Sequence, residues 1–392
     1  MDLSAEAKKF IAEYLHHDPA QLALQARKYA DLPVTELIQQ IAARQKAFAK
    51  LPSWSENLDL IFPVALSVEQ ASSELTAAFK ASLVHGELLI DLTGGFGIDA
   101  TFFARSFKHV TYIERNTELA AVVAHNVKVL GIENVTCINT EATAFLADFS
   151  GRASCIYLDP ARRGSANQKL HLLQDCEPDV LNLLPTLLNK SNQVLLKTSP
   201  MLDIDLAVQQ LGHVAQVWVI SVDNDCKEVL YLLQQQPTQS PVIKAFNLHK
   251  NQPQESFSFT KAAEEQAVVT FSEPQQYVYE PNAAVMKAGA FKTVALQYGL
   301  YKLHPNSHLY TSNMLVPHFP GRVFTCVAVS KYNKKELLQH LPQKKANIAV
   351  RNFPDTVAGI RKKTGIKDGG DYYLFATTDL TNKPVILICH KA

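Results

Sequence analysis

The spacing of apolar residues changes along the chain, and the change separates two kinds of predicted structure. In the first sixty or so residues apolar side chains recur at helical intervals, as in Phe10, Ile11 and Tyr14. From residue 87 they form short continuous runs separated by helical segments. Such alternation is typical of a parallel sheet with helices on both faces. The pattern therefore predicts a small helical domain followed by an α/β domain.

Five of the apolar runs are predicted to be buried parallel strands, because they are apolar along their whole length: ELLIDL, HVTYI, NVTCIN, ASCIYL and NQVLLK. The helix between the second and third runs should begin after Asn116 and stop at Gly131. Ahead of the first run, an S-x-x-Q capping box at Ser67 predicts one helix that continues to Leu83.

Two further apolar runs, VAQVWVISV and EVLYLLQ, are separated only by the polar turn 223–227. So short a connection permits an antiparallel hairpin but no helical crossover. Beyond Gln236 the alternation stops, with only strand-like pieces such as AVVTF and QYVYE before a predicted helix over 282–298. A second β/α alternation then runs to the C-terminus. The predicted domains are 1–65 (helical), 66–236 (α/β), 237–316 (linker and small α+β region) and 317–392 (α/β).

Charge is unevenly distributed among these domains. The 392 residues are 47% hydrophobic and 19% charged, which excludes a collagen-like or largely disordered chain. The net charge is only +1, but residues 317–392 hold 13 Lys and Arg against 5 Asp and Glu, so this part is +8 and the rest −7. The basic C-terminal domain is therefore a candidate surface for a polyanion.

Several classes of site receive no support from the sequence. The six cysteines form no CxxC pair, which fits neither a zinc module nor a disulfide framework. His304, His308 and His318 lack partners at metal spacing, so we expect no metal. No apolar segment reaches the length of a membrane helix, and the N-terminus has no signal-like core. We expect a cytoplasmic protein.

The strongest chemical motif is the turn DLTGGFGID, residues 91–99, which links the first strand to a helix. Glycines let the backbone turn sharply and approach a ligand closely. The segment from Gly95 to Ala100 also fits the dinucleotide pattern GxGxxA, with Glu114 placed to hold a ribose. However, Asp91 and Asp99 would repel a diphosphate, whereas a carboxylate at Asp91 suits the ammonium and sulfonium groups of S-adenosylmethionine.

With these motifs, residues 66–236 resemble the class I S-adenosylmethionine-dependent methyltransferases. The resemblance implies a Rossmann-like seven-stranded core whose last two strands form a hairpin. It places Asp91, Thr93, Gly95 and Gly97 around the methionyl group, Glu114 at the ribose and Glu141 near the adenine. The segment Asp159-Pro160-Ala161-Arg162 resembles the family's fourth motif, which holds the methyl acceptor.

A narrower resemblance covers nearly the whole chain. The segments EQASSELTAAFKASL, DLTGGFGID, YLDPARRG, LLKTSPMLDI and IRKKTGIKDGGDYYLFAT are similar to a bacterial subfamily of THUMP-like methyltransferases. THUMP domains accompany RNA-modifying enzymes, so the resemblance implies RNA as partner and a C-terminal α/β region of ferredoxin-like and THUMP-like type. The residues that would bind RNA are Arg163, Arg361, Lys362, Lys363 and Lys367.

The fourth motif departs from the form used for exocyclic amines. There an Asp or Asn side chain and a proline carbonyl accept the amine hydrogens, while an aromatic ring stacks on the base. Asp159 and Pro160 are present, but Arg162 occupies the stacking position. C5 methylation of uracil needs a cysteine after the fifth strand, and LLKTSPMLD has none. Lys197 in that segment receives no catalytic role.

Plainer interpretations remain open for several of these residues. Asp91 and Asp159 could cap turns, Glu114 could be a solvated acid, and Glu141 could be a helix N-terminal acid. The run 361–363 could be a solvated helix face. The sequence favours an RNA methyltransferase that uses in-line transfer, with Asp159 orienting the acceptor. The alternatives are a nicotinamide-dependent oxidoreductase and a non-catalytic RNA-binding protein with a vestigial cofactor pocket.

Overall fold

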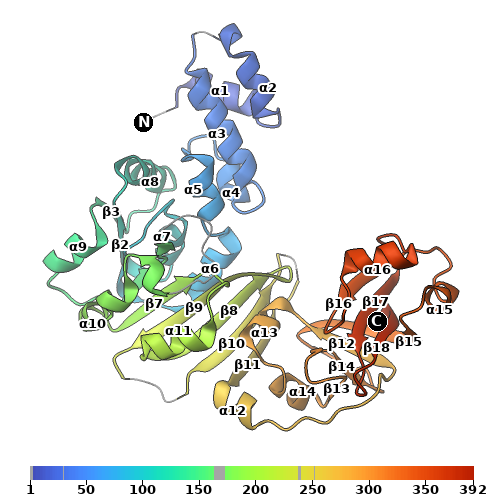
Figure 1. Cartoon of the computed structure of the whole chain (residues 1–392). Helices are drawn as coiled ribbons and strands as arrows, with labels where there is room; N and C mark the ends of the chain where they lie inside the picture. The colour runs from blue at the N-terminus through green and yellow to red at the C-terminus, as the bar shows by residue number, and fades with distance from the viewer. Residues whose placement is uncertain (1–2, 30, 163–172, 237–239, 251) are drawn as a thin grey trace. The chain divides into compact units, whose positions relative to one another are not determined.

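The computed structural model describes residues 3–29, 31–162, 173–236, 240–250 and 252–392 (Figure 1). The chain divides into two compact units, Met1–Ala215 with Leu230–Thr238 and Gln216–Val229 with Gln239–Ala392. In the described residues no helix has the length and apolar character needed to cross a membrane.

The first unit opens with six short helices, and the first three pack around a small apolar core that includes Phe10, Ile11, Leu37 and Ile41. They are α1 (Ala5–Tyr14), α2 (Pro19–Leu24), α3 (Val34–Ala47), α4 (Pro52–Ser55), α5 (Ala65–Gln70) and α6 (Glu74–Leu83), with a 3-10 turn at Ala26–Tyr29.

The single helix predicted from Ser67 to Leu83 is wrong. The chain leaves the helix after Gln70, and α6 starts from a capping box made by Ser73 and Thr76. Ser73 Oγ accepts from the Thr76 amide at 3.1 Å, and the Ser73 amide donates to the Thr76 hydroxyl at 3.2 Å. Ser67 lies inside α5, which starts at Ala65 without a side-chain cap, so the predicted box at Ser67 does not form.

Arg44 on α3 is fully buried and ties the helices to the segment that leads into α5. Its guanidinium donates to the carbonyls of Ser55, Asn57 and Leu60, at 3.3, 2.8 and 2.5 Å. It also lies 4.7 Å from the centre of the Phe62 ring. Burial lowers the pKa of Arg44 to about 10, so it remains charged at neutral pH.

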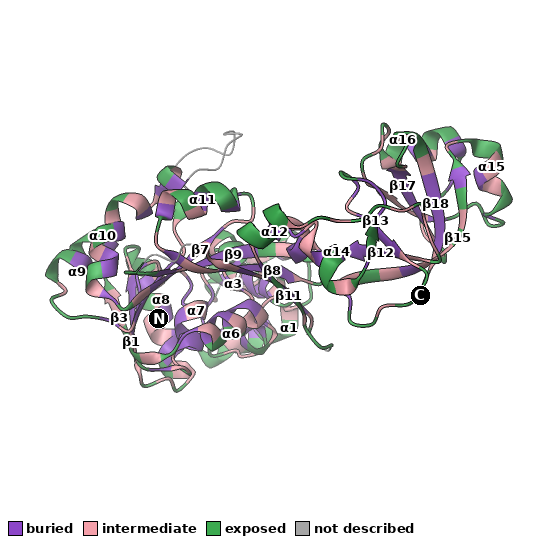
Figure 2. Ribbon diagram, turned by 90° about the horizontal axis from the view of Figure 1, so that it is seen from below, coloured by how far each residue is buried: buried purple, intermediate pink, exposed green. Residues whose placement is uncertain are grey.

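The α/β core has the five predicted parallel strands: β1 (Gly86–Asp91), β2 (Phe107–Glu114), β3 (Val135–Asn139), β4 (Cys155–Leu158) and β7 (Gln193–Thr198). Figure 2 shows the strands mostly buried beneath helices that expose one face. The helices are α7 (Ile98–Phe103), α8 (Thr117–Val129), α9 (Ala142–Asp148), α10 (Val180–Lys190) and α11 (Ile204–Leu211). As predicted, Asn116 caps α8, and Gly131 follows it with a positive φ.

The predicted hairpin is formed by β8 (Val214–Val222) and β9 (Asp225–Gln234). Asp223 and Asn224 join them with φ of 50° and 66°, as a two-residue hairpin turn requires. The sheet order is β11-β10-β8-β9-β7-β4-β1-β2-β3. It continues past Gln236 through β10 (Val242–Leu248) and β11 (Glu255–Thr260), which were not predicted, although Phe257 and Phe259 alternate with polar residues in β11 as in a half-buried strand.

The C-terminal part holds a second sheet, of order β13-β14-β12-β15-β18-β17-β16. Its strands are β12 (Tyr277–Pro281), β13 (Tyr301–Lys302), β14 (Tyr310–Ser312), β15 (Gly321–Lys331), β16 (Asn347–Val350), β17 (Tyr372–Thr378) and β18 (Pro384–Lys391); the helices are α12 (Lys261–Gln266), α13 (Ala283–Ala288), α14 (Thr293–Tyr298), α15 (Lys334–Gln339) and α16 (Val357–Thr364). The helix predicted over 282–298 is two helices, because Gly289 ends α13 at φ 80°.

We expect Arg44→Met to lower the free energy of unfolding by about 3 kcal/mol, because three carbonyls lose a charged donor inside the helical layer. Chemical denaturation measures the change. Arg27→Met is the control, since Arg27 is exposed and its removal should cost less than about 0.5 kcal/mol. Equal effects of the two substitutions would show that the Arg44 hydrogen bonds contribute nothing.

Candidate functional site

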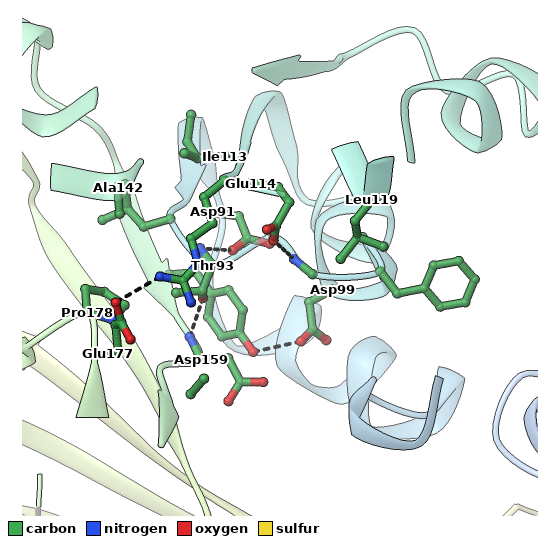
Figure 3. A pocket seen from close by; sticks show the side chains of 18 of the residues that line it. Asp91, Thr93, Asp99, Ile113, Glu114, Leu119, Ala142, Asp159, Glu177 and Pro178 are labelled. Atoms are coloured by element: carbon green, nitrogen blue, oxygen red, sulfur yellow. Dashed lines mark hydrogen bonds and ion pairs between the residues drawn. The ribbon is translucent and has the colours of Figure 1, made fainter. Parts of the chain in front are cut away.

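Acidic residues gather where neighbouring parallel strands end. Asp91 ends β1, Glu114 ends β2, and Asp159 follows β4, while Glu141 occupies the N-cap position of α9, just after β3, without a side-chain capping bond. Because β4, β1, β2 and β3 are adjacent and parallel, their carboxyl ends share one edge of the sheet. All four residues line a cavity of about 610 Å³, shown from close by in Figure 3. That volume is typical of a small-molecule site.

The glycine turn forms one wall of this cavity. A Cβ on Gly94 would lie 2.1 Å from the Tyr112 ring, and one on Gly97 would lie 2.5 Å from Val123. Both glycines are therefore required by packing. Gly95 differs, because its Cβ would meet no atom of the chain closer than 3.8 Å. Gly95 has a left-handed backbone with a φ of 53°, and it lines the cavity.

Glu114 holds the turn from the neighbouring strand. Its Oε2 accepts from the Gly95 amide at 3.0 Å (Figure 3), and its Oε1 accepts from the Asn116 amide at 2.8 Å. The Tyr112 hydroxyl donates to the Gly95 carbonyl at 2.7 Å. The end of β2 thus fixes both the amide and the carbonyl of the glycine that borders the cavity.

Asp91 is a buried carboxylate with only part of its hydrogen-bonding capacity used. The side chain is 1% exposed, and its Oδ1 accepts from the Thr93 amide at 3.1 Å. Its Oδ2 is buried without a hydrogen-bond partner among the residues the structure describes. Burial, together with the nearby Asp99 carboxylate, raises the pKa of Asp91 well above its usual value. A cation in the cavity would offset the cost of ionising Asp91.

Asp99, in the first turn of α7, lies among donors. Its Oδ2 accepts from the Ser72 hydroxyl at 2.9 Å and the Tyr157 hydroxyl at 2.7 Å, and the Lys80 Nζ lies 3.0 Å from Oδ1. Burial acts to raise the pKa of Asp99, but the cations of Lys80 and Lys197 and the Tyr157 hydrogen bond lower it overall. Asp99 is thus charged at neutral pH.

Sequence reasoning missed Lys80, whose side chain is 0% exposed and which also donates to Ser72 at 2.7 Å. A signal was present. Lys80 falls on the same helical face as Thr76, Ala77 and Ala81, which are all buried. A lysine on an apolar face needs a buried partner, and Asp99 supplies it.

Asp159 is connected to both sides of the cavity. Its amide donates to the Thr93 hydroxyl at 2.6 Å, which ties the segment after β4 to the glycine turn. Its Oδ2 contacts the Nζ of Lys197 on β7. This ion pair is the second feature that the sequence did not indicate, since Lys197 was expected to have no catalytic role.

The rest of the fourth motif is described only in part. Arg162 lies in β5 (Ala161–Arg162), whose backbone pairs with β6 (Cys176–Glu177) after the 3-10 turn at Leu173–Asp175. Arg163 lies outside the described residues. Pro178 and Glu177 border the cavity on this side (Figure 3). Arg115 donates to Glu177 at 2.8 Å across the rim.

The helical layer reaches the site through Phe96 in the glycine turn. The Phe96 ring lies 5.3 Å from Trp54 and 5.4 Å from Phe62. Nearby, the Asn126 amide group on α8 makes two hydrogen bonds of 2.8 Å with the backbone of Ile61. The N-terminal part of the chain therefore packs directly against the glycine turn.

The basic residues predicted in the C-terminal domain fall into two groups. Arg361 donates to the carbonyls of Ala346 and Ile366, both at 3.3 Å, and contacts Asp368, whereas Lys363 pairs with Asp355 at 2.7 Å. These two cations stabilise the domain.

Lys362 and Lys367 are exposed. The Lys367 backbone is hydrogen-bonded to both neighbours of Lys345, which places the exposed Lys344 and Lys345 beside it. We call Lys344, Lys345 and Lys367 the lysine cluster. In the described part of the chain no group of three His, Cys, Asp or Glu side chains is arranged to hold a metal ion.

Comparison with known proteins bears on the whole chain. Family models match residues 86–236 as an RNA cap guanine-N2 methyltransferase, 277–320 as a ferredoxin-like domain and 321–391 as THUMP domain-like. Two strains of Mycobacterium tuberculosis have a protein named as an uncharacterised S-adenosylmethionine-dependent methyltransferase that is 21% identical over 343 residues, 84% of this chain and 89% of theirs.

A crystal structure from Porphyromonas gingivalis W83, assigned as a methyltransferase, is 33% identical, with a TM-score of 0.89 over 99% of this chain and 98% of that one. These matches confirm the predicted Rossmann-like core with ferredoxin-like and THUMP-like regions, and they decide against the oxidoreductase and non-catalytic alternatives. The chain belongs to the S-adenosylmethionine-dependent methyltransferases that carry a THUMP-like C-terminal domain.

Proposed function

We propose that this methyltransferase acts on RNA and that the cavity at the ends of β1, β2 and β4 holds S-adenosylmethionine. The observation that carries the first part is the coupling of a methyltransferase core to a +8 C-terminal region that matches a THUMP-like model. The family model that matches the core is also named for methyltransferases that act on RNA. A basic surface binds the phosphate backbone, while the cavity selects the acceptor.

The donors and acceptors around the cavity fit this cofactor. Asp91 offers a buried carboxylate oxygen that lacks a partner among the described residues, which suits the ammonium of the methionyl group. The open backbone at Gly95 leaves room for close approach of the ligand. Thr93 and Gly97 complete the turn, Glu114 would hold the ribose, and Glu141 would lie by the adenine. When bound, S-adenosylmethionine supplies a methyl group already activated on sulfur.

The chain's own contribution would be to place the acceptor in line with that methyl group and to exclude water. Asp159 borders the cavity just after β4 and would orient the acceptor, with Pro160 next to it in the sequence. Arg162 and Arg163 would hold a phosphate or a base. Lys362 and the lysine cluster would bind RNA phosphates, with Arg361 and Lys363 supporting that surface through their ion pairs.

The direct test incubates the protein with methyl-labelled S-adenosylmethionine and with RNA, protein and small-molecule pools from cells that lack it. We expect label in RNA. Asp159→Ala should fold and bind S-adenosylhomocysteine but transfer no label, because the acceptor is no longer oriented. Label that enters only protein or small molecules would overturn the RNA assignment.

Two glycine variants test the cofactor site. Gly95→Ala should cost about 1 to 2 kcal/mol of stability for its left-handed backbone, yet fold and lose S-adenosylhomocysteine affinity by at least about tenfold. Gly94→Ala should destabilise more strongly, because its Cβ would overlap the Tyr112 ring. Thermal unfolding with and without ligand separates the two effects. Unchanged ligand affinity in Gly95→Ala would place the cofactor elsewhere.

Asp91 gives the site a defined pH dependence. Its pKa is raised in the free protein, and a bound ammonium would favour the ionised form, so binding releases a proton. S-adenosylhomocysteine affinity should therefore rise with pH, by up to about tenfold per unit, until the pH exceeds the raised pKa. Calorimetry in buffers below pH 7 measures this slope. In Asp91→Asn we expect weaker binding with no slope, and a slope that persists would assign the proton to another group.

Increasing salt should weaken RNA binding, and the lysine cluster should account for part of that effect. Replacing Lys344, Lys345 and Lys367 by Glu removes up to three phosphate contacts, each worth about 0.7 in the slope of log affinity against log salt on single strands. The matched control replaces the exposed Lys9, Arg27 and Lys28 of the N-terminal helices. Equal losses in both variants would contradict a specific C-terminal surface.

A further inference from the structure

Two cysteines face each other in the second sheet. Strands β15 and β18 are antiparallel neighbours (Figure 1), and their register places Cys326 directly opposite Cys389. Cys389 is fully buried in the apolar cluster that contains Phe324 and Phe375, and the partly buried Cys326 packs against the same cluster. The two thiols therefore lie on one face of the sheet, on adjacent strands.

The backbone at this position brings the two side chains close together. The Cys326 amide donates to the Gln276 carbonyl, just before β12, at 2.8 Å. On the other edge of β15, the Val323 carbonyl accepts from the Ala392 amide, just after β18, at 3.1 Å. Because backbone groups alternate between the two edges of a strand, Cys326 and Cys389 form a non-hydrogen-bonded pair, whose Cα atoms lie about 4.5 Å apart in antiparallel sheets. A disulfide needs a Cα separation of about 4.4 to 6.8 Å, so this position fits one.

Strand β15 is irregular directly after Cys326. The register shifts between Cys326 and Ala328, so the exposed Val327 is an additional residue on β15. A bulge of this kind interrupts the ladder locally and bends the strand. A small movement of β15 at the bulge would bring the sulfurs to bonding distance while the pairs on either side stay in register.

The two thiols differ in access and in reactivity. Cys326 is partly exposed, and the neighbouring Cys389 thiol lowers the pKa of Cys326, because it can donate to the Cys326 thiolate. Cys389 is fully buried, and the neighbouring Cys326 together with burial raises its pKa. An accessible thiolate beside a buried thiol is the arrangement of an attacking cysteine and the cysteine that resolves its oxidation product.

The other cysteines have no such neighbour in the described strands. Their partners across the sheet are Tyr112 for Cys137, Leu89 for Cys155 and Arg162 for Cys176. Burial also raises the pKa of Cys137 and of Cys226 to about 11, so neither is an effective thiolate at neutral pH. Oxidation should therefore be selective for Cys326.

We propose that Cys326 and Cys389 are an oxidative modification site, at which hydrogen peroxide produces a reversible disulfide. The Cys326 sulfur attacks the peroxide, the oxygen–oxygen bond breaks, and one water leaves as Cys326 becomes a sulfenic acid. The Cys389 sulfur then attacks the Cys326 sulfur, the sulfur–oxygen bond breaks, and a second water leaves with the Cys389 proton. The two thiols together lose two electrons, and the peroxide gains them.

The disulfide would join the first and last strands of the domain matched as THUMP-like. The chain between the two cysteines contains α15, β16, α16 and β17, together with the lysine cluster. A link that closes so long a loop restricts the unfolded chain and thereby stabilises the folded domain. Neither cysteine lines the cavity, so the modification acts on the C-terminal domain and not on the cofactor site.

Peptide mapping of the full-length wild-type protein tests the proposal. The reduced protein is treated with hydrogen peroxide, the remaining thiols are alkylated, and the digest is analysed by mass spectrometry without reduction. We expect a peptide containing Cys326 linked to one containing Cys389, and its loss after treatment with dithiothreitol. Cys326 that stays a free thiol, is oxidised alone to a sulfinic acid or is linked to another cysteine would overturn the proposal.

Serine variants test selectivity and stabilisation. Oxidation should raise the Tm of the wild type by at least about 3 °C, and dithiothreitol should reverse the shift. Cys326→Ser should lose both the link and the shift, whereas Cys137→Ser, at a half-buried position on β3, should keep both. A shift that persists in Cys326→Ser, or a linked wild type with the Tm of the reduced protein, would contradict stabilisation by this disulfide. Peptide mapping uses the wild-type chain, so it decides whether the link forms even if a variant fails to fold.

Discussion

The buried Asp91 carboxylate is the constraint on which the site depends. It ends a central strand, is almost completely removed from water, and keeps one oxygen without a hydrogen-bond partner in the described structure. A charge in such a place is costly unless a cation arrives. The surrounding glycine turn cannot fill the gap, because Gly95 leaves the cavity open while Gly94 and Gly97 are fixed by Tyr112 and Val123. In the unliganded protein the carboxyl is held closer to its protonated form, and a cationic ligand restores its charge.

The neighbouring acidic side chains, Asp99 and Asp159, have other partners. Asp99 is largely enclosed too, but it has Lys80, Ser72 and Tyr157 as partners and therefore remains charged. Asp159 is more exposed and has Lys197. The three carboxylates thus have distinct environments. Asp91 has one oxygen without a partner in the described structure, and Asp99 is paired with Lys80. Asp159 is paired with Lys197 and borders the cavity. Under the proposed function, Asp91 would serve the methyl donor and Asp159 the acceptor.

The C-terminal charge also divides into structural and available parts. Arg361 forms an ion pair with Asp368, and Lys363 forms one with Asp355. At Glu280, a buried carboxylate is paired with Arg322 and Arg351. The lysine cluster and Lys362 remain exposed, so the surface available to a polyanion is smaller than the +8 total suggests. Counting charges along a sequence locates a basic domain, but only the paired contacts identify which cations are available for binding.

The sequence by itself determined the parallel core, the closing hairpin and the glycine turn. Each is encoded locally, by apolar runs, by the short Asp223–Asn224 connection and by glycines at positive φ. It also suggested Asp91, Glu114 and Asp159, because strand-end positions can be read from the apolar runs. Three things needed the tertiary structure. The break after Gln70 and the new helix start at Ser73 were not encoded in the apolar spacing, and β10 and β11 became strands by adding to an existing sheet. The pairs Lys80–Asp99 and Lys197–Asp159 join residues 19 and 38 positions apart, so they exist only once strand register and helix packing bring the groups together.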